Sequence, residues 1–129
     1  MEAWINKLYE TFIETEYYKL LLEGLGNTLI ITAGALVIGV VIGMLIALIK
    51  FFAEDVPSLR PLSFICDLYV TVIRGIPVVV LLLIFYYIIM VSAEGTAVGI
   101  ITFGINSGAY MAELIRGGIG AVDRGQMEA

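Results

Sequence analysis

The stretch ITAGALVIGVVIGMLIALIK, from Ile31 to Lys50, has no charged residue before its last position. It lies in an uncharged segment over residues 24–49, which is long enough for a helix to cross the roughly 30 Å hydrocarbon core of a membrane. Small residues recur in it at every fourth position, a spacing that places them on one face of a helix and lets a second helix approach closely. These residues are Ala35, Gly39, Gly43 and Ala47. The stretch therefore predicts a membrane-spanning helix with a close packing face.

Two more uncharged segments follow, over residues 75–93 and 95–112. The second is marginal in length, and we expect its helix to continue to residue 116. The composition agrees, since 60% of the residues are hydrophobic and only 15% are charged, against roughly a quarter in soluble proteins. A buried helix of a soluble protein is the alternative for any one segment, but too few polar residues exist to cover three. The sequence therefore predicts an all-α, polytopic membrane protein with three transmembrane helices.

Residues 1–22 precede the first span and are expected to form an external amphipathic arm. Trp4 and Leu8 fall on one side of a helix, and Lys7 and Glu10 fall on the other. This pattern is typical of a helix that lies in the membrane interface with its aromatic side chains at the depth of the lipid headgroups. A gating role is the alternative interpretation of this arm.

Lysine and arginine counts predict the orientation of the chain, because cytoplasmic flanks carry an excess of these residues. These counts predict that the N-terminus lies outside the cell, because this orientation leaves only Lys7 and Lys19 outside. The basic residues that then face the cytoplasm are Lys50, Arg60, Arg74, Arg116 and Arg124. The N-terminus lacks the basic stretch and short apolar run of a signal peptide, so we expect the first span to be retained.

Residues 50–73 are expected to form a cytoplasmic loop and the start of a helix, because Pro57 and Pro61 interrupt the apolar pattern. A helix that restarts after the second proline places three polar residues on one face. These residues are Asp67, Thr71 and Arg74. The sequence GIP at residues 75–77 predicts a kink at the start of the second span. Simple extension of Arg74 to the inner lipid headgroups is the alternative to a functional role.

The third span, residues 95–116, has two contrasting sides on a helical wheel. The polar side carries Thr102, Asn106, Tyr110, Glu113 and Gly117. The small side carries Gly104, Gly108 and Ala112. Because polar groups are costly to expose to lipid, we expect the polar side to face a bundle interior or a wet cavity, and the small side to pack on a helix. Hydrogen bonding between helices is the alternative role for the polar side.

Residues needed for common catalytic sites are absent from this sequence. The chain has no histidine, which excludes Ser-His-Asp and Cys-His arrangements and leaves no histidine-containing metal site. No lysine follows a glycine as in a phosphate-binding Walker loop, and the net charge of −5 disfavours nucleic acid. We therefore expect a chain that is no enzyme and that holds no cofactor or metal.

Three motifs together give the chain a family resemblance. They are GLGNTLIIT at residues 24–32, YVTVIRGIPVVVLLLIFYY at residues 69–87 and AYMAELIRGGIGAVDRGQMEA at residues 109–129. With them the chain resembles the membrane permease subunits of polar amino-acid ABC importers, of the histidine and glutamine type of binding-protein-dependent permeases. The third motif is similar to the approach to the EAA loop of that family, whose opening Gly-Gln-x-Glu-Ala corresponds to residues 125–129.

The resemblance implies that residues 117–129 begin a cytoplasmic coupling segment that docks on an ATPase subunit. The coupling residues would be Asp123, Arg124, Gly125, Gln126, Glu128 and Ala129. In the family the loop continues and about two more spans follow, so the chain is expected to be the N-terminal part of a roughly five-helix permease domain. A fragment and a true stop at the last residue both remain open. A solvated terminus is the alternative reading of this tail.

The resemblance also implies a function and a set of partners. The subunit would dimerise with itself or a relative in a bacterial inner membrane, and it would work with cytoplasmic ABC ATPases and an external solute-binding protein. Polar amino acids would pass inward by alternating access.

The candidate pathway or gate residues are Thr71, Arg74, Asn106, Tyr110 and Glu113. Arg74 and Glu113 both fall near cytoplasmic helix ends, which suggests either contact with a zwitterion or an ion pair that closes an inner gate. A structural scaffold protein, a small exporter and a non-functional permease fragment are the alternatives.

Overall fold

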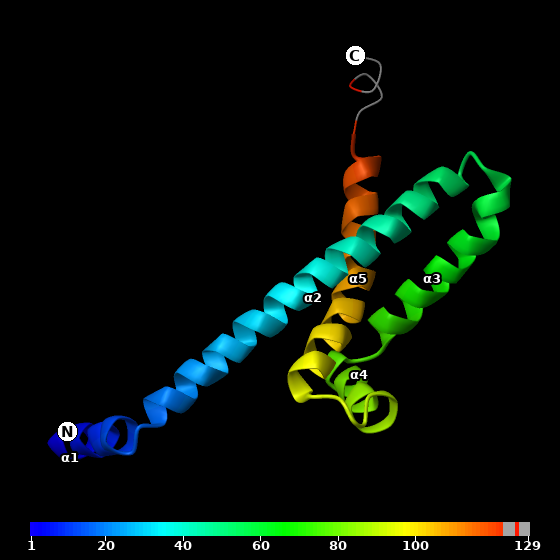
Figure 1. The fold of residues 1–129 in the computed structure, drawn as a ribbon. Coiled ribbons are helices and arrows are strands. Elements are labelled where there is room, and N and C mark those ends of the chain that lie inside the picture. Colours follow the sequence, from blue (N-terminus) through cyan, green and yellow to red (C-terminus); the bar gives the residue numbers. More distant parts are fainter. Residues whose placement is uncertain (123–125, 127–129) are drawn as a thin grey trace. The chain divides into compact units, whose positions relative to one another are not determined.

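A computed structural model describes residues 1–122 and Gln126, and all regular structure in this part of the chain is helical (Figure 1). The elements are α1 Glu2–Tyr9, η1 Glu10–Glu14, α2 Tyr17–Ala53, η2 Pro57–Leu59, α3 Arg60–Gly75, α4 Val78–Ile84, η3 Phe85–Ile89 and α5 Gly95–Gly120. The predicted all-α class is confirmed. The chain divides into two compact units, residues 1–30 and residues 31–129.

The first unit contains α1, the π-helical η1 and the beginning of α2. Glu16 adopts a positive φ of 56° and separates η1 from α2. Lys19 pairs with this Glu16 at 2.8 Å on an exposed surface. No residue of α1 or η1 is buried, and Trp4 is 73% exposed. The predicted amphipathic segment is thus helical, and its place at the membrane surface stays a prediction.

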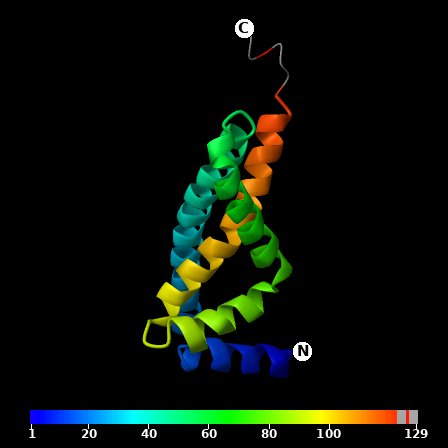
Figure 2. The same ribbon diagram turned by 90° about the vertical axis from the view of Figure 1, so that its right-hand side faces the viewer.

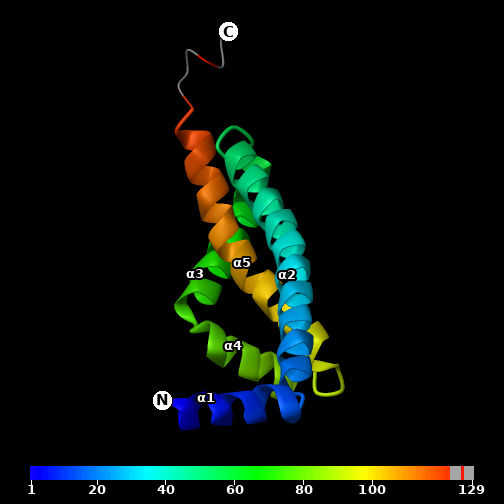
Figure 3. The same cartoon turned by 90° about the vertical axis from the view of Figure 1, so that its left-hand side faces the viewer.

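In the second unit, α2 continues from Ile31 to Ala53 and α5 runs alongside it (Figures 2 and 3). Both helices are long and apolar enough to cross a membrane. The seven small residues expected on the packing faces are all buried. They are Ala35, Gly39, Gly43, Ala47, Gly104, Gly108 and Ala112.

Glycines on both helices make this packing close and reciprocal. A Cβ atom added to Gly43 of α2 would lie 2.5 Å from Cβ of Met111, and one added to Gly104 of α5 would lie 2.7 Å from Cγ2 of Ile38. Each helix therefore inserts side chains over the glycines of the other. Ser107 of α5 also donates a hydrogen bond of 3.3 Å to the backbone carbonyl of Ala35.

The chain bends sharply between α3 and α4, as the sequence GIP predicted. The stretches Pro57–Gly75 and Val78–Ile89 meet at an angle of 103°. Ile76 is extended, with φ −95° and ψ 126°, because a residue before proline is disfavoured in the helical conformation. The bent pair makes a third membrane crossing only if it counts as one broken span. The break lies at the start of the expected second span, and the stretch Val78–Ile89 that follows it crosses a membrane only together with Pro57–Gly75, so two or three helices of the described residues can cross a membrane.

The helix α3 packs on α5 at the end of α2 that carries Lys50. A small cluster of buried residues marks this contact, with Ile46, Cys66, Val70 and Ala112 at its centre. The hydroxyl of Tyr69 donates a hydrogen bond to the backbone carbonyl of Ile105. The end of α2, the C-terminal part of α3 and the middle of α5 therefore surround one region of the structure.

Candidate functional site

An open hollow of about 500 Å³ lies where α2, α3 and α5 meet, and we call it the polar hollow. Its lining residues are Lys50, Asp67, Val70, Thr71, Arg74, Gly75, Tyr110, Glu113 and Arg116. Cations and carboxylates both contribute to this lining. A hollow of mixed charge between apolar helices suits a small polar molecule that carries both signs of charge.

Arg74 extends from the last turn of α3 over the aromatic ring of Tyr110. Its guanidinium carbon lies 5.2 Å from the ring centroid, within the range of a cation–π interaction. A cation at this place also complements the partial negative charge at the C-terminal end of α3. The guanidinium forms no ion pair with a carboxylate among the described residues, so its hydrogen-bond donors remain open to a ligand.

Lys50 is the buried cation of the polar hollow. The residue is only 8% exposed and forms ion pairs with Asp67 of α3 and with Glu113 of α5, the latter at 3.6 Å. A buried ammonium group needs such partners, because an unpaired charge away from water is costly. The two ion pairs therefore join the end of α2 to both neighbouring helices.

The structure brings four of the five expected pathway residues to the polar hollow. These are Thr71, Arg74, Tyr110 and Glu113. Asn106 is partly buried one turn earlier on α5 and does not line the hollow. On the same side of α5, Thr102 is fully buried, and its Oγ1 has no hydrogen-bond partner among the described residues.

The ion pair suggested between Arg74 and Glu113 does not form in this structure. Glu113 pairs with Lys50 instead, and Arg74 lies over Tyr110. The reason is the length of α2, which continues to Ala53 and presents Lys50 to the hollow, where the sequence analysis placed it in a loop. The predicted contact is therefore replaced by one with a different cation.

The sequence did not predict five of the lining residues. Three of these five are charged, namely Lys50, Asp67 and Arg116, and the other two are Val70 and Gly75. A signal for the lysine was present, because it follows Gly43 and Ala47 at offsets of seven and three and so falls on the packing face of α2. Asp67 shares a face with Thr71, as predicted, but it was not included among the site residues.

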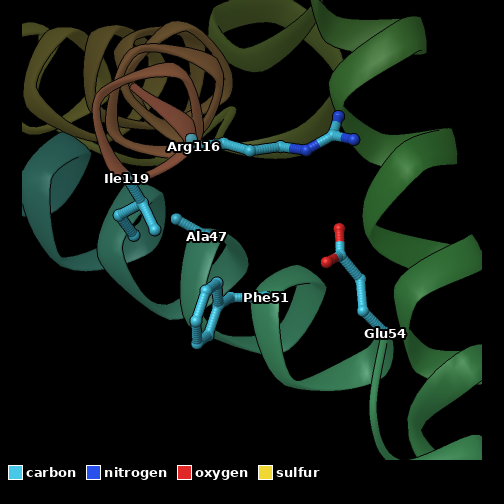
Figure 4. Close-up of a pocket in the computed structure, with 6 residues that line it drawn as sticks. Ala47, Phe51, Glu54, Arg116 and Ile119 are labelled. Carbon is cyan, nitrogen blue, oxygen red and sulfur yellow. The ribbon is translucent and has the colours of Figure 1, made fainter. Parts of the chain in front are cut away.

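A second hollow of about 260 Å³ continues toward the C-terminal end of α5. Its lining residues are Ala47, Phe51, Glu54, Arg116, Ile119 and Gly120. Figure 4 shows the side chains of Arg116, from α5, and of Glu54, from the turn directly after α2, ending close to the same side of this hollow. Because Arg116 lines both hollows, the polar hollow and the second hollow are adjacent.

The expected coupling residues fall mostly outside the described part of the chain. Asp123, Arg124, Gly125, Glu128 and Ala129 lie outside it, and Gln126 is exposed. Gly117 is also exposed, and α5 continues past it to Gly120. Within the described residues, no group of three or more His, Cys, Asp or Glu side chains could hold a metal ion.

Comparisons with known proteins relate the chain to transport proteins, although no family model matches it. The putative glutamine transport system permease protein GlnP of Rickettsia prowazekii is 40% identical over 113 residues, which cover 84% of this chain and 50% of the relative. The arginine transport system permease protein ArtQ of Bacillus subtilis is 35% identical over 84% of this chain and 49% of its own length.

A solved structure is similar to this chain in both fold and sequence. This crystal structure of an amino acid ABC transporter with histidines matches with a TM-score of 0.76 and 40% identity, over 89% of this chain and 53% of that one. The chain spans about half the length of the relatives that it matches. With its apolar helices, it is a membrane-embedded protein. The chain is homologous to the permease proteins of amino-acid ABC transport systems, as its motifs predicted.

Proposed function

We propose that this chain is the membrane-embedded permease part of an ATP-driven importer for polar amino acids. The observation that carries the proposal is the polar hollow, which offers cations and carboxylates between helices of a chain homologous to amino-acid transport permeases. The names of the relatives point to glutamine, arginine or a similar polar amino acid as the substrate class.

The charges of the polar hollow match the two charged groups of an amino acid. The guanidinium of Arg74, which has no carboxylate partner in the described chain, would bind the carboxylate of the substrate in a charge-assisted interaction. The side chain of Asp67 lies on the same lining and would attract its ammonium group. Thr71 adds a hydroxyl that can donate or accept a hydrogen bond.

The proposed mechanism is alternating access, driven by partner proteins. The N-terminal arm would lie outside the cell, and residues 117–129 would lie in the cytoplasm as the beginning of a segment that docks on an ABC ATPase. An external solute-binding protein would deliver the substrate, and a second permease subunit would complete the pathway. Small movements of packed helices can transmit such a signal, because close packing has discrete arrangements.

Transport by the full-length permease tests this proposal. The permease would be reconstituted in proteoliposomes with its ATPase and binding protein, and uptake of radiolabelled glutamine, arginine and histidine would be measured with and without ATP. We expect ATP-dependent uptake of at least one of them. Wild-type complex that shows no uptake, or uptake indifferent to ATP, would contradict the proposed function.

The variant Arg74→Gln tests the assigned site in the same assay. A hydrogen bond to a charged group contributes about 1.5–3 kcal/mol, so we expect uptake to fall about tenfold or more. Arg60→Gln is the matched control, because Arg60 is an exposed arginine at the start of α3 that does not line the polar hollow. Equal uptake by the two variants would remove Arg74 from the pathway.

A further inference from the structure

Glu113 lines the polar hollow together with two cations, Lys50 and Arg74, and this arrangement is the basis of a further inference. Lys50 contacts it from α2 at 3.6 Å, and the guanidinium of Arg74, from α3, lies over the ring of Tyr110. Tyr110 and Glu113 are three residues apart on α5, so they share one face of that helix. The carboxylate of Glu113 therefore lines the same hollow as both cations, and it is paired with only one of them.

The two ion pairs of Lys50 differ in length. Its contact with Asp67 is the shorter one, whereas its contact with Glu113 is a long 3.6 Å. The side chains of Asp67 and Glu113 are 54% and 37% exposed, so water reaches both carboxylates, and the longer contact with Glu113 carries the weaker attraction to the ammonium group. Lys50 itself is buried and keeps Asp67 as its partner. The lysine can therefore release Glu113 without becoming an unpaired buried charge.

We infer that Lys50 is a positioning residue that holds Glu113 away from Arg74, and that Glu113 changes from Lys50 to Arg74 when the polar hollow closes. While Lys50 holds Glu113, the guanidinium of Arg74 is open to the carboxylate of a substrate. Once Glu113 binds Arg74, that guanidinium is neutralised and the substrate loses its partner. The inference rests on the proposed function, since it assigns regulation to the same site.

Substitutions at Lys50 test the inference through uptake by the reconstituted full-length complex. Lys50→Met keeps most of the aliphatic stem and removes the charge, so Glu113 should pair with Arg74 and uptake should fall about fivefold or more. Lys50→Arg keeps a cation at this place, so its uptake should stay within about threefold of wild type, a smaller change than the roughly fivefold fall expected for Lys50→Met. Lys19→Met is the matched control, because Lys19 has an exposed ion pair with Glu16. Its uptake should equal that of wild type.

The double variant Lys50→Met/Glu113→Gln separates positioning from a merely structural role. Without the carboxylate of Glu113, Arg74 loses the partner that the inference assigns to it, so the double variant should transport at least about fivefold faster than Lys50→Met alone. Thermal unfolding of each purified complex shows whether the variants fold. A folded double variant that transports no better than Lys50→Met, or a Lys50→Met complex that transports like wild type, would overturn the inference. Failure of the proposed function can be told apart from failure of this inference, because in the former case the wild-type complex itself would show no uptake.

Discussion

The close approach of α2 and α5 predicts a large effect for the substitution of a single glycine. A Cβ atom at Gly43 would lie 2.5 Å from Cβ of Met111 and 3.0 Å from the backbone nitrogen of Ala112. Neither atom is the far end of a flexible side chain, so no change of rotamer relieves the clash. Gly43→Ala must therefore move the two helices apart.

The cost follows from a comparison with a glycine in the same helix that touches nothing. Gly26 of α2 has no atom within 4 Å of an added Cβ, so Gly26→Ala gains only the higher helix propensity of alanine, about 0.5–1 kcal/mol. Gly43→Ala gains the same stability from helix propensity, but overpacking lowers its free energy of unfolding by about 1–3 kcal/mol. Subtracting one variant from the other removes the propensity contribution. Gly43→Ala should thus be about 1–3 kcal/mol less stable than Gly26→Ala.

Equilibrium unfolding of the full-length permease in mixed detergent micelles measures this difference. The free energies of unfolding of wild type, Gly26→Ala and Gly43→Ala would be compared under identical conditions. We expect the order Gly26→Ala, wild type, Gly43→Ala from most to least stable. If Gly43→Ala were as stable as Gly26→Ala, the helices could not approach as closely as the structure shows, and the reasoning from the glycine face would be refuted.

Two other predictions concern α3 and the tail. Tyr69→Phe removes the hydrogen bond to the backbone carbonyl of Ile105, so the free energy of unfolding should fall by about 0.5–1.5 kcal/mol in the same assay, and an unchanged value would contradict the contact between α3 and α5. Gln126→Cys in a Cys66→Ala background should react with a membrane-impermeant thiol reagent in inside-out vesicles but not in intact cells, because Gln126 is exposed and the tail is proposed to be cytoplasmic. Labelling of this cysteine in intact cells would contradict the proposed orientation.

The packing of α2 on α5 was predictable from the sequence because it depends on local periodicity. Small residues at every fourth position can occupy only one face of a helix, and that face was expected to receive a second helix. The contrast between the small and polar sides of α5 has the same origin. Such patterns identify which faces are buried, but the partner of each face depends on chain topology.

The bend at residues 75–77 was predictable in position but not in size. Proline removes a backbone donor and disfavours a helical conformation of the preceding residue, which places a break at Pro77 from the sequence alone. The angle of 103° depends instead on how α4 packs against α5. Contacts that are distant in sequence fixed this angle, and no local pattern contains them.

Lys50 was not predicted as a site residue, because its charge was taken to mark the end of a membrane helix. Counting uncharged residues ends the first span at residue 49, yet α2 continues to Ala53. Lysine is compatible with a buried helical position when carboxylates from other helices reach it, and Asp67 and Glu113 do so here. A charged residue that continues the small-residue face of a helix is therefore better interpreted as a position that forms an ion pair with a neighbouring helix. By that rule Lys50, rather than Arg74, is the expected partner of Glu113 at the site where the three helices meet.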